Sequence, residues 1–385
     1  MNIWLVTREY AGIAEAGGVK NVACSLSENL VKCGHSVTVF MPLYGCSDIS
    51  AIADFSCVWH KPVTVLVQNK RYIVSFTHGT LNGVNLVFIT NKAFSQKKGV
   101  YTYTPEEESA DNSCTRGTGH KDAQFLNSLF QQAVAFYGET CSETEKPDII
   151  HSQDATAALV PAFIGQKIEE SEVYKNFYEK TKFVVTIHNA GPGYHHEFYS
   201  VEEAFSYTNL KIENLKKALN NNTVEPFLLA AQNSCITTVS PEYAQEISAE
   251  KIDTAGLSSR FNQFGTKIIG ITNGIDFSKY EPSNPKASLL PFAFNPEKND
   301  FLGKQKCLDY LINEYAATEN EKCKNLKSIT KYGNLCKENY DSYIYITYHG
   351  RLVTQKGISV LARAAEKLLS NNAPVRFIFI GQGQA

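Results

Sequence analysis

The strongest constraint on the fold is a series of short apolar runs, each rich in β-branched residues and each followed by a polar turn. They occupy residues 2–7, 37–42, 84–90, 147–152, 182–189, 234–240, 267–274, 343–351 and 375–383. Runs that are apolar on both faces are typical of buried parallel strands rather than half-exposed antiparallel ones.

Helical patterns lie between many of these runs. Residues 19–30 carry apolar side chains at helical spacing, and Gly34 follows where such a helix would end. Residues 155–164 and 358–369 show the same pattern. Strands that alternate with helices predict an α/β fold with a parallel sheet. Ligands of such sheets bind at the carboxyl ends of the strands, so the residues just after each strand are the candidates for a site.

Two segments interrupt this rhythm. Residues 273–300 are rich in Pro and Asn and predict a hinge between a first domain at 1–272 and a partial second domain at 301–385. Residues 317–341 are rich in Lys, Asn and Glu and predict a solvated insertion. The second domain contains two predicted strands, too few for a stable sheet, so we expect further chain or support from the first domain.

Composition excludes several classes of protein. A net charge of -2 over 385 residues gives no sign of a nucleic-acid or polybasic membrane partner. Cys24, Cys33 and Cys235 lie in apolar segments, where we expect reduced, structural thiols. The N-terminus lacks the features of a signal peptide, and no apolar run approaches the roughly 20 residues of a membrane span. We therefore expect a cytoplasmic protein.

The polar residues that follow the predicted strands form an ordered series. It comprises Glu15, Gly17, Gly18, Asn21, His151, Gln153, Asp154, His188, Asn189, Ser240, Pro241, Arg351 and Lys356. Gly17 and Gly18 leave two interpretations open. They form a tight turn, or they bring bare backbone N–H groups at a helix N-terminus up to a ligand phosphate.

Several motifs occur in the order found in one known family. They are "AEAGGVKNV", "GHSVTVFMPLYG", "IIHSQDATAALVPAF", "TIHN", "TTVSPEYAQEI", "GITNGIDFSKYEP" and "GRLVTQKGI". Through them the chain resembles the bacterial glycogen synthase and plant starch synthase family. The resemblance implies the GT-B fold, with two Rossmann-like domains and parallel sheets. It also implies transfer of glucose from a nucleotide sugar, usually ADP-glucose, to the non-reducing end of an α-1,4-glucan such as glycogen, with retention of configuration.

The resemblance further implies a site in the cleft between the two domains. His188 and Asp154 are expected beside the transferred glucose and the acceptor. Arg351 and Lys356 are expected to hold the diphosphate together with the Gly17 and Gly18 amides, because the family requires no metal or other cofactor. Binding of the negatively charged diphosphate would thus explain the presence of both the glycine turn and the basic pair.

The chain departs from the family in the donor-binding turn. Glu15 stands where the family usually has Lys, and Asn21 stands where it has Asp. A carboxylate there repels a diphosphate, and Lys20 is a neighbouring cation that can offset it. The segment after "TIHN" also differs. The family's second domain continues past residue 383, so this chain resembles a truncated member.

Two further groups of residues have competing interpretations. His195, His196 and Glu197 are consecutive, and consecutive residues on an extended segment point to opposite faces, so we expect no metal site there. Tyr101 and Tyr103 lie where the family has a loop near the acceptor. They stack on sugar faces, or they belong to an ordinary mobile loop.

Two alternative functions stay open. A truncated, charge-altered relative binds glucan and transfers nothing. Another GT-B enzyme of the sucrose synthase, trehalose-forming or glycan phosphorylase type shares the more general motifs, but a phosphorylase needs a pyridoxal phosphate lysine in a C-terminal domain that this chain does not reach.

Overall fold

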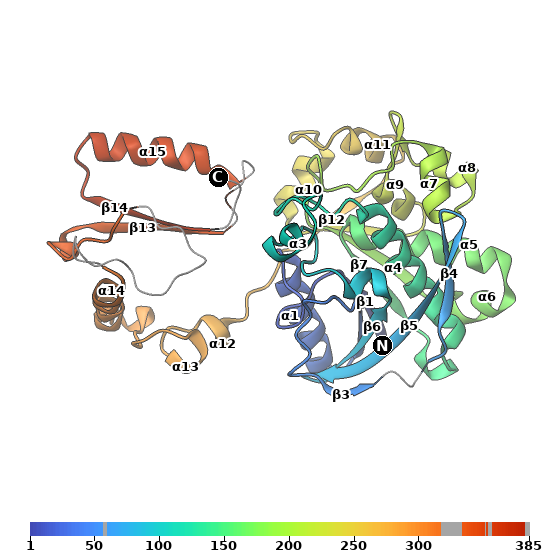
Figure 1. Cartoon of the computed structure of the whole chain (residues 1–385), viewed down its shortest axis with the longest axis horizontal. Helices are drawn as coiled ribbons and strands as arrows, with labels where there is room; N and C mark the ends of the chain where they lie inside the picture. Colours follow the sequence, from blue (N-terminus) through green and yellow to red (C-terminus); the bar gives the residue numbers. More distant parts are fainter. Residues whose placement is uncertain (57–59, 317–332, 351, 353–355, 382–385) are drawn as a thin grey trace. The chain divides into compact units, whose positions relative to one another are not determined.

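The chain forms two compact units, Met1–Gly274 and Ile275–Ala385, in the computed structural model shown in Figure 1. The structure describes residues 1–56, 60–316, 333–350, 352 and 356–381. Most of the predicted insertion at 317–341 therefore lies outside the described residues. The domain limits at 272 and 301 stay a prediction, as does the hinge between them.

Unit 1 is built on a 10-stranded sheet with the order β12-β11-β8-β7-β1-β2-β6-β5-β3, in which β4 also pairs with β5. Its strands are β1 (Asn2–Val6), β2 (Ser36–Pro42), β3 (Ala53–Ser56), β4 (Val63–Val67), β5 (Lys70–Leu81), β6 (Val84–Thr90), β7 (Ile149–Gln153), β8 (Lys182–Ile187), β11 (Cys235–Thr238) and β12 (Ile268–Gly270). All pairs from β12 to β6 are parallel, whereas β3, β4 and β6 each pair antiparallel with β5. The predicted parallel sheet is confirmed, and the antiparallel extension was not predicted.

Helices pack on this sheet. Helix α1 (Val19–Lys32) contacts β2 and β6, and α4 (Ala123–Tyr137) contacts β2, β4 and β6. The other unit 1 helices are α2 (Lys92–Ser95), α3 (Pro105–Ala110), α5 (Val160–Glu170), α6 (Glu172–Tyr178), α7 (Val201–Thr208), α8 (Ile212–Lys217), α9 (Pro226–Ala231), α10 (Pro241–Ser248) and α11 (Leu257–Gln263), and a short hairpin joins β9 (Leu219–Asn220) to β10 (Thr223–Val224).

Unit 2 has a parallel strand pair, β13 (Ile344–His349) and β14 (Val375–Ile380), joined through α15 (Ile358–Ser370). These three elements were predicted. Helices α12 (Phe277–Tyr280), α13 (Pro285–Ser288) and α14 (Leu302–Tyr315) precede them. Apolar side chains of the strand pair are exposed, Ile344 by 65% and Ile380 by 63%.

The cysteines correct one expectation. The cysteines that the structure describes are free thiols, but of the three that the sequence placed in apolar segments only Cys24 is buried. Cys33 and Cys235 are exposed, because Cys33 ends α1 and Cys235 is the first residue of β11. Their apolar sequence neighbours therefore do not enclose them.

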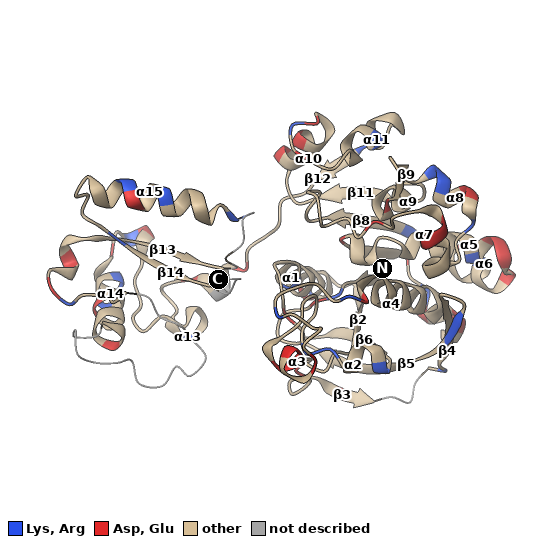
Figure 2. Ribbon diagram, turned by 45° about the horizontal axis from the view of Figure 1, so that its top comes forward, with Lys and Arg blue, Asp and Glu red and all other residues tan. Residues whose placement is uncertain are grey.

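Charge is spread rather than gathered. Figure 2 shows Lys and Arg interspersed with Asp and Glu over the helices, apart from the acidic first turn of α3 at Glu106, Glu107 and Glu108. Among the described residues, no helix combines the length and apolarity that a membrane crossing needs.

The order of the strands marks one place for a site. Strand β1 pairs with β2 on one side and with β7 on the other, so the chain leaves β1 in one direction and returns on its other flank. In open parallel sheets, ligands bind outside the carboxyl ends of the strands at such a switch point. The loops after β1, β7 and β8 therefore form the candidate site.

Candidate active site

The loop between β1 and α1 holds two glycines that differ in what they contact. Glu9 is 1% exposed, and its Oε2 accepts hydrogen bonds from the backbone N–H groups of Ala16 at 2.9 Å and Gly17 at 2.6 Å. A Cβ atom at Gly17 would lie 3.0 Å from Glu9 Oε1, whereas a Cβ at Gly18 would meet no atom within 4 Å. The nearby carboxylate of Glu9 therefore explains why a residue without a side chain stands at position 17. Position 18 has no such neighbour, and open space lies beside it.

The charge-altered residue of this turn has a partner. Lys20 Nζ forms an ion pair with Glu15 Oε2, and Glu15 Oε1 accepts the Gly12 N–H at 2.7 Å. The hydrogen bond from Lys20, aided by the Gly12 amide, lowers the pKa of Glu15. Lys20 thus offsets the negative charge of Glu15 within the loop. Asn21 is exposed in the first turn of α1.

Asp154 follows β7 with an unusual backbone. Its φ is 65° and its ψ is 178°, a region that glycine adopts readily and other residues rarely. Its side-chain Oδ1 is buried and has no hydrogen-bond partner among the described residues. Burial raises the pKa of Asp154 to about 7 and the charge of Glu9 adds to this, while the backbone amides of His188, Ala155 and Asn189 oppose it. Strained backbone and unpaired buried polar atoms cluster at functional sites.

His188 follows β8 and lies beside the end of β7. Its Nε2 lies 2.8 Å from Oε1 of Gln153, which is itself 1% exposed. Burial lowers the pKa of His188 to about 4, so the ring is neutral at pH 7 and donates its Nε2 proton to Gln153. The parallel pairing of β7 with β8 therefore brings two predicted site residues, Asp154 and His188, to neighbouring strand ends.

His151 belongs to the sheet rather than to this group. It lies within β7, and its Nε2 is 2.7 Å from Thr186 Oγ1, which in turn lies 2.7 Å from Thr237 Oγ1. Burial, with a smaller effect of His188, lowers the pKa of His151 to about 4. The ring completes a polar ladder across β7, β8 and β11.

Arg8 is a buried charge at the strand ends that the sequence analysis missed. It is 2% exposed, and it donates from Nε to Tyr44 Oη at 2.6 Å, from Nη1 to Asn127 Oδ1 at 2.5 Å and from Nη2 to the Val100 carbonyl at 2.8 Å. Its guanidinium also lies 5.4 Å from the centre of the Tyr101 ring. A charged pair directly after an apolar strand, Arg8 with Glu9, was the available signal.

Tyr101 and Tyr103 lie between α2 and α3, and both pack against other parts of unit 1. Tyr101 packs on Arg8, and Tyr103 is 7% exposed, with its ring 4.9 Å from that of His120 and its Oη accepting the Lys121 N–H at 3.0 Å. Neither interpretation of these residues describes Tyr103, because its buried ring supports the loop instead of facing a sugar or moving freely.

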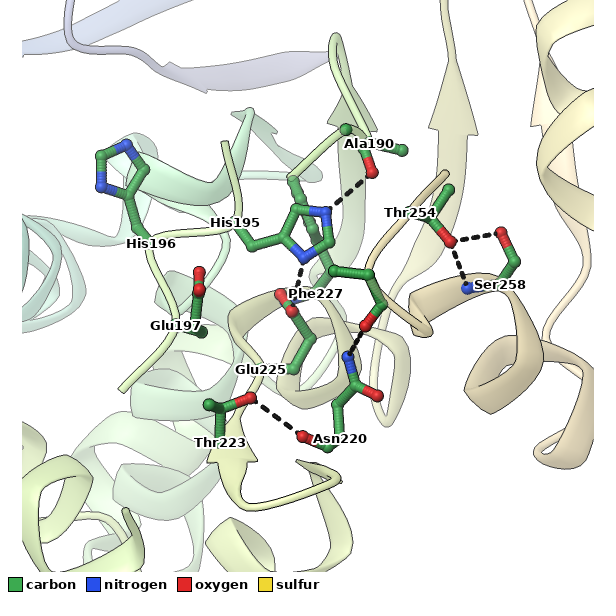
Figure 3. A network of polar contacts seen from close by, with 12 residues as sticks. Ala190, His195, His196, Glu197, Asn220, Thr223, Glu225, Phe227, Thr254 and Ser258 are labelled. Atoms are coloured by element: carbon green, nitrogen blue, oxygen red, sulfur yellow. Dashed lines mark hydrogen bonds and ion pairs between the residues drawn. The ribbon is translucent and has the colours of Figure 1, made fainter. Parts of the chain in front are cut away.

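His195 forms a buried ion pair rather than part of a histidine cluster. Its Nδ1 lies 2.8 Å from Glu225 Oε2 and its Nε2 lies 2.8 Å from the Ala190 carbonyl (Figure 3). Figure 3 also shows the His196 ring pointing away from His195. The two histidine rings therefore do not face a common point, and the absence of a metal site there stays a prediction.

Unit 2 carries the predicted basic pair. Lys356 is exposed and precedes Gly357, the N-terminal cap of α15, whose φ is 66°. Arg351 lies outside the described residues. The structure therefore does not test the pairing of Arg351 with Lys356.

One group of His, Cys and carboxylate side chains among the described residues has its ligand atoms close together. The atoms of His60, Cys141 and Glu145 lie within 4.8 Å of one another. The group lies near the amino ends of the parallel strands, whereas Asp154 lies at their carboxyl ends. The side chain of Asn2, at the start of β1, donates to the Glu145 carbonyl at 2.9 Å. Burial, followed by the charge of Glu145, raises the pKa of the Cys141 thiol, so it stays protonated.

Comparison with known proteins identifies the family. The model of the starch synthase catalytic domain matches residues 2–263. The chain belongs to this family. The glycogen synthase of Aliivibrio fischeri (strain MJ11) is 27% identical over 386 residues, covering 100% of this chain and 69% of the relative. That of Kosmotoga olearia is 28% identical over 396 residues, covering 100% and 68%.

A solved structure supports the fold. The catalytic domain of starch synthase IV from Arabidopsis thaliana, bound to ADP and acarbose, matches with a TM-score of 0.75 at 23% identity, covering 100% of this chain and 69% of the other. The α/β fold of this chain is thus of the GT-B type. With the family match, the chain is a hexosyltransferase of the glycogen and starch synthase type.

Proposed function

We propose that this glycogen synthase relative transfers glucose from ADP-glucose to the non-reducing end of an α-1,4-glucan, and that the loops after β1, β7 and β8 contribute the site. The carbon–oxygen bond from glucose to the diphosphate breaks, and a bond to the acceptor hydroxyl oxygen forms on the same face of the sugar. Attack on the same face retains the configuration, and the hydroxyl proton leaves with the diphosphate, so the step balances without a metal or another cofactor.

The observation that carries the proposal is Asp154. Its backbone is strained and its buried Oδ1 has no partner among the described residues, at the switch point of the sheet. We assign this oxygen the role of accepting a hydrogen bond from a sugar hydroxyl. His188, which is neutral, lies on the neighbouring strand end and contacts a second hydroxyl.

In the proposed reaction, backbone N–H groups and cationic side chains bind the diphosphate. The open space beside Gly18 permits close approach of a phosphate to the backbone at the start of α1. Arg351 and Lys356 neutralise the charge that develops on the leaving diphosphate. Asn21 and the Glu15–Lys20 pair lie in the same turn and adjust its charge.

The test is transfer of labelled glucose to glycogen, with ADP-glucose and UDP-glucose as parallel donors. We expect transfer from ADP-glucose, and we expect Lys356→Ala to lower kcat about 100-fold, because such charge stabilisation is worth roughly that much. Lys367→Ala, at an exposed lysine in the last turn of α15, is the matched control and should leave kcat unchanged. Equal rates for the two variants would sink the assignment of Lys356.

A second candidate is a glucan-binding relative that transfers nothing. It is favoured by the Gly17 N–H, which already donates to Glu9, and by the carboxylate of Glu15 in the same turn. Glycogen binding in the absence of transfer from either donor would favour this candidate over the synthase.

A further inference from the structure

The His195–Glu225 pair is among the most enclosed charges in unit 1. The side chains are 2% and 1% exposed. Both ring nitrogens of His195 face acceptors at 2.8 Å, the Glu225 carboxylate and the Ala190 carbonyl. While Glu225 is ionised, neither partner has a proton to offer, so the ring donates from both nitrogens and carries a positive charge. Burial raises the pKa of Glu225, and the hydrogen bond and charge of His195 oppose that rise.

The titratable groups around His195 favour that charge. Burial alone favours the neutral ring, but the hydrogen bond and charge of Glu225, the Ala190 carbonyl and the charge of Glu197 together raise the pKa of His195 to about 9. The adjacent His196 behaves in the opposite way. Burial, then Arg8 and His195, lowers the pKa of His196 to about 4, so it stays neutral.

Glu225 is itself held in place. It caps the N-terminus of α9, where its Oε1 accepts the Phe227 N–H at 3.3 Å, and its own N–H donates to the Ala218 carbonyl at 3.0 Å. The Phe227 ring lies edge-on to the His195 ring at 5.9 Å (Figure 3). The carboxylate therefore offers His195 a fixed anchor.

The other bond of His195 reaches the candidate site. Ala190 is buried and follows His188 by one intervening residue, Asn189. Its carbonyl accepts from His195, and its N–H donates to Tyr243 Oη, on α10, at 2.9 Å. The backbone just after His188 is therefore held by side-chain hydrogen bonds at both the carbonyl and the N–H of Ala190.

The rest of this loop is fixed at its far end. Gln124 Nε2, on α4, donates to the carbonyls of His196 at 3.0 Å and Glu197 at 2.7 Å. Phe198 and Val224 exchange backbone hydrogen bonds of 3.0 and 2.8 Å. Between these contacts and Ala190, the His195 side chain ties the loop to Glu225, the N-terminal cap of α9.

We infer that His195, charged and anchored by Glu225, is a positioning residue that holds the Ala190 carbonyl and so fixes the His188 side chain at the sugar subsite. The inference rests on the proposed function, because it assigns His188 to that subsite. Stability alone does not account for the pair, since replacing both partners of a buried ion pair by apolar residues of the same volume is often neutral or stabilising, even though removing one partner is costly. A directional bond to one carbonyl does account for it.

The experiment compares His195→Gln with His60→Gln. The side-chain amide of Gln has N–H groups on one nitrogen, so it does not span both acceptors of His195. His60 pairs with Glu145 at 3.1 Å at the other edge of the same sheet, which makes His60→Gln the matched control. We expect His195→Gln to lower kcat about 10- to 100-fold with a smaller change in KM, because small misplacements cost that much. His60→Gln should keep the wild-type kcat.

Two further variants separate positioning from folding. Glu225→Asp keeps the carboxylate and should retain more kcat than Glu225→Gln. In wild type, kcat should fall as pH rises through about 9, where His195 loses its proton. In Glu225→Gln that alkaline limb should move to lower pH, because the carboxylate that favours the charged ring is gone.

Amide hydrogen exchange tests the same inference without activity. The Ala190 N–H should exchange at least about 10-fold faster in His195→Gln than in wild type, while the amides of β1 keep their rates. Unchanged exchange at Ala190, or equal kcat in His195→Gln and wild type, would overturn the inference. Absence of transfer by wild type with faster exchange at Ala190 would instead count against the proposed function alone.

Discussion

In unit 1, one histidine–glutamate pair lies near the carboxyl ends of the parallel strands, here called the carboxyl edge, and another lies near their amino ends, the amino edge. The two pairs differ in how deeply their side chains are buried. At the carboxyl edge, the side chains of His195 and Glu225 are 2% and 1% exposed and lie 2.8 Å apart. At the amino edge, those of His60 and Glu145 are 7% and 39% exposed and lie 3.1 Å apart. The same two residue types thus form a buried anchor in one place and a partly solvated contact in the other.

The two ends of β7 repeat this difference. Asp148, just before the strand, is exposed, and its Oδ2 accepts the Asn2 N–H at 2.7 Å. Asp154, just after it, has a strained backbone and a buried oxygen without a partner among the described residues. The carboxylate before β7 is thus paired, whereas the carboxylate after it has a strained backbone and an unpartnered buried oxygen, costs that a structural role does not repay. That contrast is what marks one edge as functional.

The largest expected effect on stability comes from His195. Its pKa in the folded chain, about 9, lies above the ordinary value of 6.5, so its contribution is fully present below pH 6.5 and is lost as pH rises through about 9. The shift corresponds to on the order of 3 kcal/mol. The free energies of unfolding of wild type and His195→Gln, measured in urea, should therefore differ most near pH 6 and least near pH 10. For His60→Gln, the ion pair with the partly exposed Glu145 should account for about 0–1 kcal/mol of any loss.

A difference between wild type and His195→Gln that stays constant from pH 6 to pH 10 would contradict this account of the carboxyl-edge pair.

The backbone strain at Asp154 predicts a smaller effect. Asp154→Gly should be more stable than Asp154→Ala by about 1–2 kcal/mol, because φ of 65° favours glycine and both variants remove the carboxylate. The free energy of unfolding in urea measures the difference. The same pair of substitutions at Asp148 should show the reverse order, and equal stabilities of the two Asp154 variants would remove the argument from strain.

The glycine turn gives the smallest effect. Gly17→Ala should lower stability by about 1 kcal/mol, because the added methyl approaches the Glu9 carboxylate, which accepts the Ala16 and Gly17 N–H groups. Gly18→Ala should leave stability unchanged or slightly raised, since its φ is −86° and the space beside it is open. Thermal unfolding measures stability and calorimetry with ADP measures affinity. Tighter or equal ADP binding by Gly18→Ala would argue against a phosphate at that amide.

Much of the parallel core was predictable because its strands are apolar on both faces. The same criterion missed β3, β4 and β5, which alternate: Val63, Val65 and Val67 are buried while Thr64 is exposed. A tight turn at Gln68 and Asn69, with φ of 50° and 59°, joins β4 to β5. A search for alternating runs around such a turn would have found this hairpin.

The site was partly predictable for a similar reason. Parallel strands bring their carboxyl ends together, so Asp154 and His188 follow from sequence order once the sheet is assumed. Arg8 did not, because its partners, Asn127 and the Val100 carbonyl, are distant in the sequence. The pairing of His195 with Glu225 depends likewise on the packing of α9 against the loop after β8, which no local pattern encodes.

The most direct test of the carboxyl edge as the site of transfer compares Asp154→Asn with Asp148→Asn at the two ends of β7. Initial rates of glucose transfer from ADP-glucose to glycogen would be measured for both variants and wild type. We predict that Asp154→Asn lowers kcat about 100- to 1000-fold, the loss typical of one hydrogen bond made in the transition state, and that Asp148→Asn keeps the wild-type rate. Comparable rates for the two variants would contradict the account.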